Sequence, residues 1–220
     1  MGKKNVEAVI AVIKILEKWS KKHKMPTVRA TSKERNPFKT LITCLLSLRT
    51  QDENTRKASS ALFKVADTPK KILKLPQKKL EKLIYSSGYY KNKAKTIKHV
   101  SKVLIEKYKG KVPSDTKSLM EIKGIGRKTA AITRVFGFGK KDCIPTDVHV
   151  HTIANRLGWA KTKTPEQTEI QLMKIVSKKY WFELNTLFVL FGKYVCKAIP
   201  FCSECPVREY CKRICAGKSR

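Results

Sequence analysis

The sequence predicts an all-α protein of about ten helices joined by short loops. Apolar residues recur at helical spacing along most of the chain, helix-capping residues begin several of these segments, and alternating patterns typical of β-hairpins are scarce. The 220 residues are 41% hydrophobic, enough for a core that needs no disulfide support. No apolar run approaches the roughly 18 residues of a membrane span and no signal-peptide layout opens the chain. We therefore expect an intracellular protein with no membrane partner.

The expected helices follow in order along the chain. Val6–Trp19 carries apolar residues on most turns, and Phe38–Leu48 is so apolar that we expect a buried helix. Asn54–Val65, Gln77–Tyr85 and Lys93–Tyr108 are amphipathic.

Further helices are marked by their first residues or by their apolar character. Thr68-Pro69 and Thr164-Pro165 each place a capping hydroxyl before a proline at the first helical position, and Gln167 completes a capping box. Leu184–Val195 is another apolar helix. Glycine- or serine-rich linkers are absent, so any division into domains is compact.

The charge balance indicates a polyanionic partner. The chain has 39 Lys and 10 Arg against 17 acidic residues, a net charge of +32, and this excess is spread over every segment. Such a field favours nucleic acid. The alternative is a lysine-rich surface that serves solubility or heat tolerance.

The segment Leu119–Ala131 is the most informative. An apolar helix end leads into Gly124-Ile125-Gly126, and a new helix follows at once. The glycines permit positive φ and close approach of another molecule, and a helix start suits a phosphate oxygen. This pattern is typical of a helix-hairpin-helix motif, which holds the DNA backbone without reading its sequence. An ordinary tight helix–helix turn is the alternative.

Two residues after the hairpin glycines have side chains that could act in covalent or acid–base chemistry. Lys128 falls in the first turn of the second hairpin helix, where a cation is disfavoured and a neutral, nucleophilic amine is favoured. The alternative is a solvated or phosphate-pairing lysine. Asp147 precedes an apolar helical stretch that ends near Leu157, so it can cap that helix, and a capping carboxylate can also face a cleft.

Five of the seven cysteines fall in the last 25 residues. An odd number cannot pair completely, so this cluster indicates a metal or iron–sulfur site, whereas Cys44 and Cys143 are expected to be buried apolar residues. Four thiolates at this spacing suit a cubane cluster and a tetrahedral zinc ion equally. Two ligand sets are possible, and they share three cysteines: Cys196 or Cys215, with Cys202, Cys205 and Cys211.

Several segments together carry a family resemblance: Leu45-Leu46-Ser47 with Asp52, Gly88–Ala94, the hairpin through Ala130, Asp147 with His149, and the cysteine-rich tail. On these residues the sequence resembles the endonuclease III family, the iron–sulfur DNA glycosylase/AP-lyases of the helix-hairpin-helix–GPD superfamily. The resemblance covers nearly the whole chain.

The resemblance implies two helical domains that flank a DNA-binding cleft. Residues 30–140 would form a six-helix barrel that contains the hairpin. Residues 1–29 and 141–220 would form the domain that carries a 4Fe-4S cluster. The ligands that the resemblance favours are Cys196, Cys202, Cys205 and Cys211, although the first gap is one residue shorter than in the family.

The resemblance also implies the reaction: a bifunctional glycosylase/AP-lyase of base excision repair, acting as a cytoplasmic monomer on double-stranded DNA with damaged bases or abasic sites. Lys128 would attack C1′ and expel an oxidised pyrimidine, and β-elimination from the Schiff base would cut the strand. Asp147 would deprotonate Lys128 or stabilise the oxocarbenium charge.

The DNA contacts implied by the resemblance lie in three places. The hairpin residues Lys123, Gly124, Ile125, Gly126 and Arg127 would hold the backbone while the nucleotide is flipped out. Tyr89 lies at the wedge position, where family members often carry Leu. Arg49 lies where they usually carry a Gln that probes the orphan base, and Lys123 replaces the usual Pro.

Two alternatives remain beside the bifunctional enzyme. In a monofunctional mismatch glycosylase, Lys128 would bind phosphate, but such relatives lack a lysine at this position. In a non-enzymatic helix-hairpin-helix module with a structural metal, neither Lys128 nor Asp147 would be needed.

Overall fold

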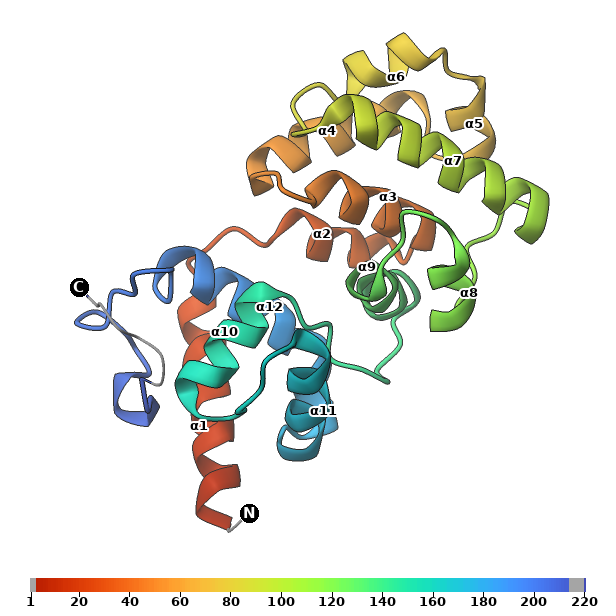
Figure 1. Cartoon of the computed structure of the whole chain (residues 1–220). Coiled ribbons are helices and arrows are strands. Elements are labelled where there is room, and N and C mark those ends of the chain that lie inside the picture. The colour runs from red at the N-terminus through yellow and green to blue at the C-terminus, as the bar shows by residue number, and fades with distance from the viewer. Residues whose placement is uncertain (1–2, 214–219) are drawn as a thin grey trace. The chain divides into compact units, whose positions relative to one another are not determined.

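The computed structural model describes residues 3–213 and 220, and these contain no β-strand (Figure 1). The all-α prediction is thereby confirmed. Twelve α-helices occur in the described part, against about ten expected. No helix in this part is long and apolar enough to cross a membrane.

The chain divides into two compact units, and each has its own hydrophobic core. One unit is Thr27–Lys140. The other joins Met1–Pro26 to Lys141–Arg220.

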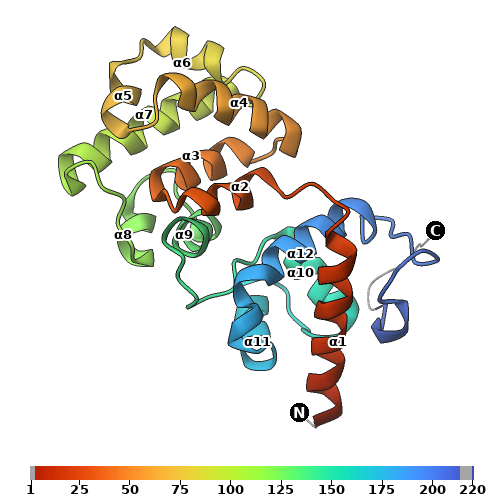
Figure 2. The same ribbon diagram turned by 180° about the vertical axis from the view of Figure 1, so that it is seen from behind.

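The Thr27–Lys140 unit is built around one buried helix, α3. It contains α2 (Thr27–Ala30), a 3-10 turn η1 (Thr31–Glu34), α3 (Pro37–Ser47), α4 (Asp52–Val65), α5 (Pro69–Lys74), α6 (Gln77–Leu83), α7 (Tyr90–Tyr108), α8 (Thr116–Glu121), α9 (Arg127–Ile132) and a π-helical turn η2 (Thr133–Gly137). Within this unit α3 lies between α4 and α7 on one side and α2 and α9 on the other (Figures 1 and 2). Its interior position explains its continuous apolar sequence, since residues 40–46 are all buried.

The second unit packs four helices, α1 and α10–α12, around its core. It contains α1 (Lys3–Ser20), α10 (Val148–Leu157), α11 (Pro165–Ile175), a 3-10 turn η3 (Lys178–Tyr180), α12 (Trp181–Tyr194) and a 3-10 turn η4 (Arg208–Tyr210). Helix α12 contacts α1 and α10, and α10 contacts α11. Cys196, Cys205 and Cys211 pack against this core.

The helix starts agree with the capping signals. Thr68 accepts a hydrogen bond from the Lys71 amide at 3.3 Å, and Thr164 accepts one from the Gln167 amide at 3.4 Å. The predicted buried states of Cys44 and Cys143 are also confirmed, at 0% and 7% exposure.

Three helices begin three residues before the predicted start: α1 at Lys3, α7 at Tyr90 and α12 at Trp181. At α7 no ordinary cap precedes the helix. The preceding Tyr89 caps it with left-handed backbone (φ 59°) and no side-chain hydrogen bond. No Ser, Thr, Asp or Asn marks this start.

Candidate functional site

The predicted turn after Leu119 lies between α8 and α9. Asp115 caps α8 by accepting from the Ser118 amide at 2.8 Å. The Ile125 amide donates to the Ile122 carbonyl at 3.0 Å and closes the turn. The Ile125 side chain is only 5% exposed and packs in the core, so this residue holds the hairpin in place while its neighbours form the exposed surface.

The two hairpin glycines differ in whether the fold could accept a side chain at their positions. Gly124 has φ of +99°, and a Cβ atom there would lie 2.6 Å from Cγ2 of Thr96 on α7. Gly126 is the N-cap of α9 with φ of −91°, and a Cβ atom would meet nothing within 4 Å. The fold therefore requires glycine at position 124, whereas position 126 leaves backbone open to an approaching molecule.

The exposed rim of the hairpin is basic. Lys123 and Arg127 are exposed, and Lys128 is half-buried at the second position of α9. Arg134 braces this hairpin from η2, since its Nε donates to the Ser114 carbonyl at 3.2 Å and its Nη1 to the Thr116 hydroxyl at 2.7 Å. Lys128 thus lies in the first turn of α9, where the sequence predicted it.

Asp147 is the N-cap of α10 and is 7% exposed. Its Oδ1 accepts hydrogen bonds from the amides of His149 and Val150, both at 3.0 Å. The capping interpretation from the sequence is therefore correct, and it leaves a role in chemistry open because a cap engages the carboxylate without neutralising it.

Arg49 and Tyr89 come together on one open pocket of the Thr27–Lys140 unit. The pocket is lined by residues of the α3–α4 loop (Leu48–Gln51), of the α6–α7 loop (Ile84–Tyr89) and of the adjoining helix starts. The Arg49 guanidinium lies 5.8 Å from the centre of the Tyr89 ring, which is 62% exposed. Both residues have left-handed backbone, with φ of 49° and 59°.

A buried lysine that the sequence analysis did not single out connects these two loops. Lys93 is 8% exposed, and its Nζ lies 2.6–2.8 Å from four acceptors: the carbonyls of Leu46 and Leu48 and the hydroxyls of Thr50 and Ser87. Burial lowers the pKa of Lys93 to about 8, so the ammonium form predominates at pH 7. The sequence does contain a sign that Lys93 is buried. Lys93 lies at helical spacing beside Ala94, Ile97, Ser101 and Leu104, which form the buried face of α7.

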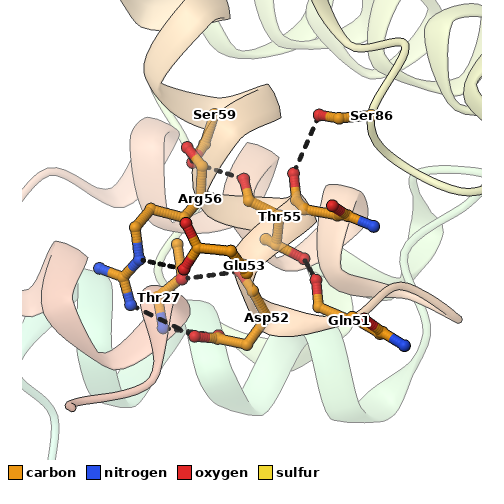
Figure 3. Close-up of polar contacts among 9 residues, drawn as sticks. Thr27, Gln51, Asp52, Glu53, Thr55, Arg56, Ser59 and Ser86 are labelled. Atoms are coloured by element: carbon orange, nitrogen blue, oxygen red, sulfur yellow. Dashed lines mark hydrogen bonds and ion pairs between the residues drawn. The ribbon is translucent and has the colours of Figure 1, made fainter.

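The start of α4 anchors the far side of the α3–α4 loop (Figure 3). Asp52 accepts from the Thr27 amide at 2.8 Å and from Arg56 at 3.3 Å. The Ser86 hydroxyl donates to the Asn54 carbonyl at 3.1 Å, which ties the α6–α7 loop to α4. The Asp52 of the family resemblance therefore has a structural role in this unit.

The four predicted ligand cysteines line a single pocket of the other unit. Cys196, Cys202, Cys205 and Cys211 share this pocket with mainly apolar side chains, among them Ile153, Leu157 and Phe191. Cys215, the alternative ligand, lies outside the described residues.

Arg156 of α10 is a buried residue of this site that the sequence did not predict. It is 8% exposed and donates to Cys196 Sγ at 3.3 Å and to the carbonyls of Cys196, Lys197 and Ala198 at 2.6–3.3 Å.

The chemistry of this pocket suits an iron–sulfur cluster. Burial raises the pKa of the Cys196 thiol, against a lowering effect of Arg156, and raises that of Cys205 to about 11. A bound group of positive iron atoms would offset this desolvation and hold the sulfurs as thiolates. Among the described residues, no three His, Cys, Asp or Glu side chains group closely enough to hold a metal ion. The four cysteine thiols that line the pocket are a donor set that an iron–sulfur cluster takes, and that a zinc ion also takes.

Comparison with known proteins identifies related chains. Residues 42–178 match the profile of the HhH-GPD superfamily base excision DNA repair proteins. Endonuclease III of Thermotoga maritima is 46% identical over 181 residues, which cover 82% of this chain and 84% of that protein. Endonuclease III of Rickettsia conorii is 39% identical over 201 residues, covering 91% and 94%.

Two solved structures resemble the whole fold. A non-covalent endonuclease III–DNA complex superposes with a TM-score of 0.82 at 33% identity, covering 94% of this chain and 95% of that one. A trapped endonuclease III–DNA covalent intermediate, an estranged-adenine complex, gives 0.80 at 32% identity, covering 94% and 96%. The profile, the relatives and the fold agree, and the chain belongs to the endonuclease III family of the HhH-GPD superfamily of base excision DNA repair proteins.

Proposed function

We propose that this DNA glycosylase/AP-lyase of base excision repair is bifunctional and releases oxidised pyrimidines from double-stranded DNA as a monomer. The glycosylase/AP-lyase activity follows from its family. The observation that carries the bifunctional assignment is Lys128, which stands at the second position of α9 directly after the hairpin. A lysine amine supplies the covalent chemistry that a monofunctional enzyme does not need.

The reaction begins with the Lys128 amine as nucleophile. Its lone pair forms a bond to C1′, and the damaged base leaves with the electrons of the glycosidic bond and takes up a proton. One of the two protons on the attached nitrogen then passes to the ring oxygen as the C1′–O4′ bond breaks, which leaves a protonated Schiff base between Lys128 and C1′ and a hydroxyl at C4′. The trapped covalent intermediate known for an endonuclease III supports this step.

Strand cleavage follows from the same covalent intermediate. The iminium group makes the 2′ proton acidic, and its removal drives expulsion of the 3′ phosphate with the electrons of the C3′–O bond. Water then hydrolyses the Schiff base and returns the Lys128 amine. Each bond that forms or breaks is therefore accounted for without an oxidant or reductant.

Asp147 supplies the negative charge in this scheme. It accepts the proton that Lys128 must lose before attack, or it stabilises positive charge on the sugar as the base departs. Its buried position at the start of α10 strengthens either interaction, because charges act over a lower dielectric there.

DNA is held mainly through its backbone. The net charge of +32 and the basic hairpin rim of Lys123 and Arg127 support this assignment. The open backbone at Gly126 would approach a phosphate. Tyr89 would fill the space of the flipped nucleotide by stacking, and Arg49 would contact the base left opposite.

The four cysteines Cys196, Cys202, Cys205 and Cys211 would hold the 4Fe-4S cluster. When bound, the cluster cross-links the loop after α12 through four iron–thiolate bonds. Arg156 fixes the first part of that loop by its hydrogen bonds to residues 196–198.

One experiment separates the candidate functions. The protein is incubated with duplex DNA that contains thymine glycol, with and without borohydride. A bifunctional enzyme releases the base and forms a reduced covalent adduct. Base release without an adduct would indicate a monofunctional glycosylase, and neither signal would leave only a DNA-binding module.

A further inference from the structure

Two exposed residues that the proposed function places against DNA, Arg49 and Tyr89, rest on unusual backbone. Both have left-handed φ although neither is glycine. Such a conformation is unfavourable for a residue with a Cβ atom and persists where the surroundings fix it. The structure must therefore contain an element that holds both loops.

The Lys93 side chain contacts both loops and the end of α3 at once. Its Nζ lies 2.6 Å from the Leu48 carbonyl and 2.7 Å from the Thr50 hydroxyl, the residues on either side of Arg49. It also lies 2.8 Å from the Ser87 hydroxyl, two residues before Tyr89. The Lys93 amide donates to the Tyr89 carbonyl at 3.0 Å, so the same residue fixes the start of α7.

A cation is well suited to this position. The carbonyls of Leu46 and Leu48 belong to the end of α3, where the helix dipole is negative and the last carbonyls lack partners inside the helix. An ammonium group has three donors and can serve several acceptors that diverge, which an apolar side chain of equal length cannot do.

The surrounding hydrogen bonds lock the two loops into one arrangement around Lys93. The Thr50 hydroxyl accepts from the Gly88 amide at 3.1 Å and therefore bridges the loops directly. The Ser87 hydroxyl donates to the Leu46 carbonyl at 3.0 Å. A Cβ atom on Gly88 would lie 3.0 Å from the Arg49 carbonyl oxygen, which shows how closely the loops pack.

We propose that Lys93 is a positioning residue, whose buried ammonium group joins the α3–α4 loop to the α6–α7 loop and presets Arg49 and Tyr89 for insertion into DNA. This inference rests on the proposed function for the part that concerns DNA. Lys93 touches no DNA in this account, and its effect reaches the substrate only through the two loops.

The test replaces Lys93 by Met, which keeps most of the length of the side chain and removes the donors. The control is Lys102→Met on the same helix, since Lys102 is an exposed lysine 3.8 Å from Glu106. Single-turnover base release is measured on a thymine glycol duplex. A 2-aminopurine placed opposite the lesion reports unstacking when the enzyme engages, and the affinity for undamaged duplex is measured separately.

Misplaced loops should slow base release by roughly 10- to 100-fold in Lys93→Met. They should also reduce the 2-aminopurine signal, as Tyr89→Ala should. Affinity for undamaged duplex should change no more than in Lys102→Met, because each variant loses one charge. In a Tyr89→Ala background, Lys93→Met should have a smaller effect than in the wild type, because the part that acts through the Tyr89 ring is already lost.

Base release and a 2-aminopurine signal equal to those of the wild type would overturn the proposal, as would fully additive effects with Tyr89→Ala. If Lys93→Met does not fold, Thr50→Val removes one bridging acceptor and should give a smaller loss in the same direction. A Thr50→Val variant with wild-type values would then contradict the proposal.

Failure of the proposed function is a separate outcome. A wild type that releases no base refutes that function. Hydrogen exchange of residues 48–51 and 84–89 and the 2-aminopurine signal on binding still decide the Lys93 proposal. Faster exchange in Lys93→Met supports it, and unchanged exchange contradicts it.

Discussion

Replacing the two hairpin glycines by alanine, one at a time, separates the folding role of the turn from its DNA-binding role. At Gly124 the new methyl group meets two obstacles: left-handed backbone at φ of +99° and a Thr96 methyl carbon 2.6 Å away. The Thr96 hydroxyl donates to the Asn92 carbonyl at 3.0 Å, so rotating this side chain away breaks that bond. At Gly126 neither obstacle exists.

The magnitudes follow from these contacts. Left-handed backbone costs a residue with a Cβ atom about 1–2 kcal/mol, and overpacking adds about 1 kcal/mol or more. Gly124→Ala should therefore lower the free energy of unfolding by about 2–3 kcal/mol. Gly126→Ala should change it by no more than about 0.5 kcal/mol, as surface substitutions do. It should weaken binding to undamaged duplex about tenfold, because the methyl group displaces a phosphate whose loss costs roughly 1.5 kcal/mol.

Urea unfolding followed by far-UV circular dichroism gives the stability of each variant, and fluorescence anisotropy with a labelled duplex at fixed salt gives the affinity. The prediction is a crossed result, with stability lost at Gly124 and affinity lost at Gly126. Wild-type affinity in Gly126→Ala would refute the idea that DNA approaches this backbone. Equal destabilisation by both variants would refute the steric argument.

Four further predictions are open to direct measurement. Asp147→Asn keeps the cap of α10 but should lower turnover by orders of magnitude, whereas losing a cap alone costs roughly 1 kcal/mol of stability; near-normal turnover would leave only the capping role. Cys196→Ser should lose iron and Cys215→Ser should keep full iron content, and the reverse pattern in an iron assay would exchange the ligands. Affinity for undamaged duplex should fall log-linearly and steeply with salt, and a flat titration would contradict backbone binding. The pKa of Lys93 is lowered from 10.5 to about 8, so the unfolded chain binds more protons between these values. The stability of the wild type relative to Lys93→Met should therefore rise from pH 8 to pH 10.5, and a constant difference over this range in urea titrations would argue against a buried ammonium group.

The sequence predicted the features that depend on neighbouring residues. Helix positions followed from apolar spacing, and the start of α10 followed from Asp147 after a proline. The hairpin followed from two glycines between helices. Each of these features depends on about a dozen consecutive residues, so it could be predicted without knowing which distant residues come into contact.

The parts that the sequence did not predict depend on distant partners or on very short elements. Lys93 forms hydrogen bonds with residues up to 47 positions away, and Arg156 with residues up to 42 positions away. The sequence indicates these contacts only indirectly, through a charged residue placed on an otherwise apolar helix face. Helix α2 and the turn η1 have four residues each, which is too short for periodicity to show. The left-handed start of α7 at Tyr89 has no capping residue to mark it.

The central claim, that Lys128 is the nucleophile, is tested most directly by locating the covalent bond itself. The borohydride-reduced adduct with damaged duplex is digested with nuclease and protease, and mass spectrometry identifies the lysine that carries the sugar remnant. The chain offers 39 lysines, so chance labelling would spread over many of them. We predict one modified site at Lys128 and no adduct in Lys128→Gln. A remnant on another residue, or undiminished trapping in that variant, would contradict the mechanism.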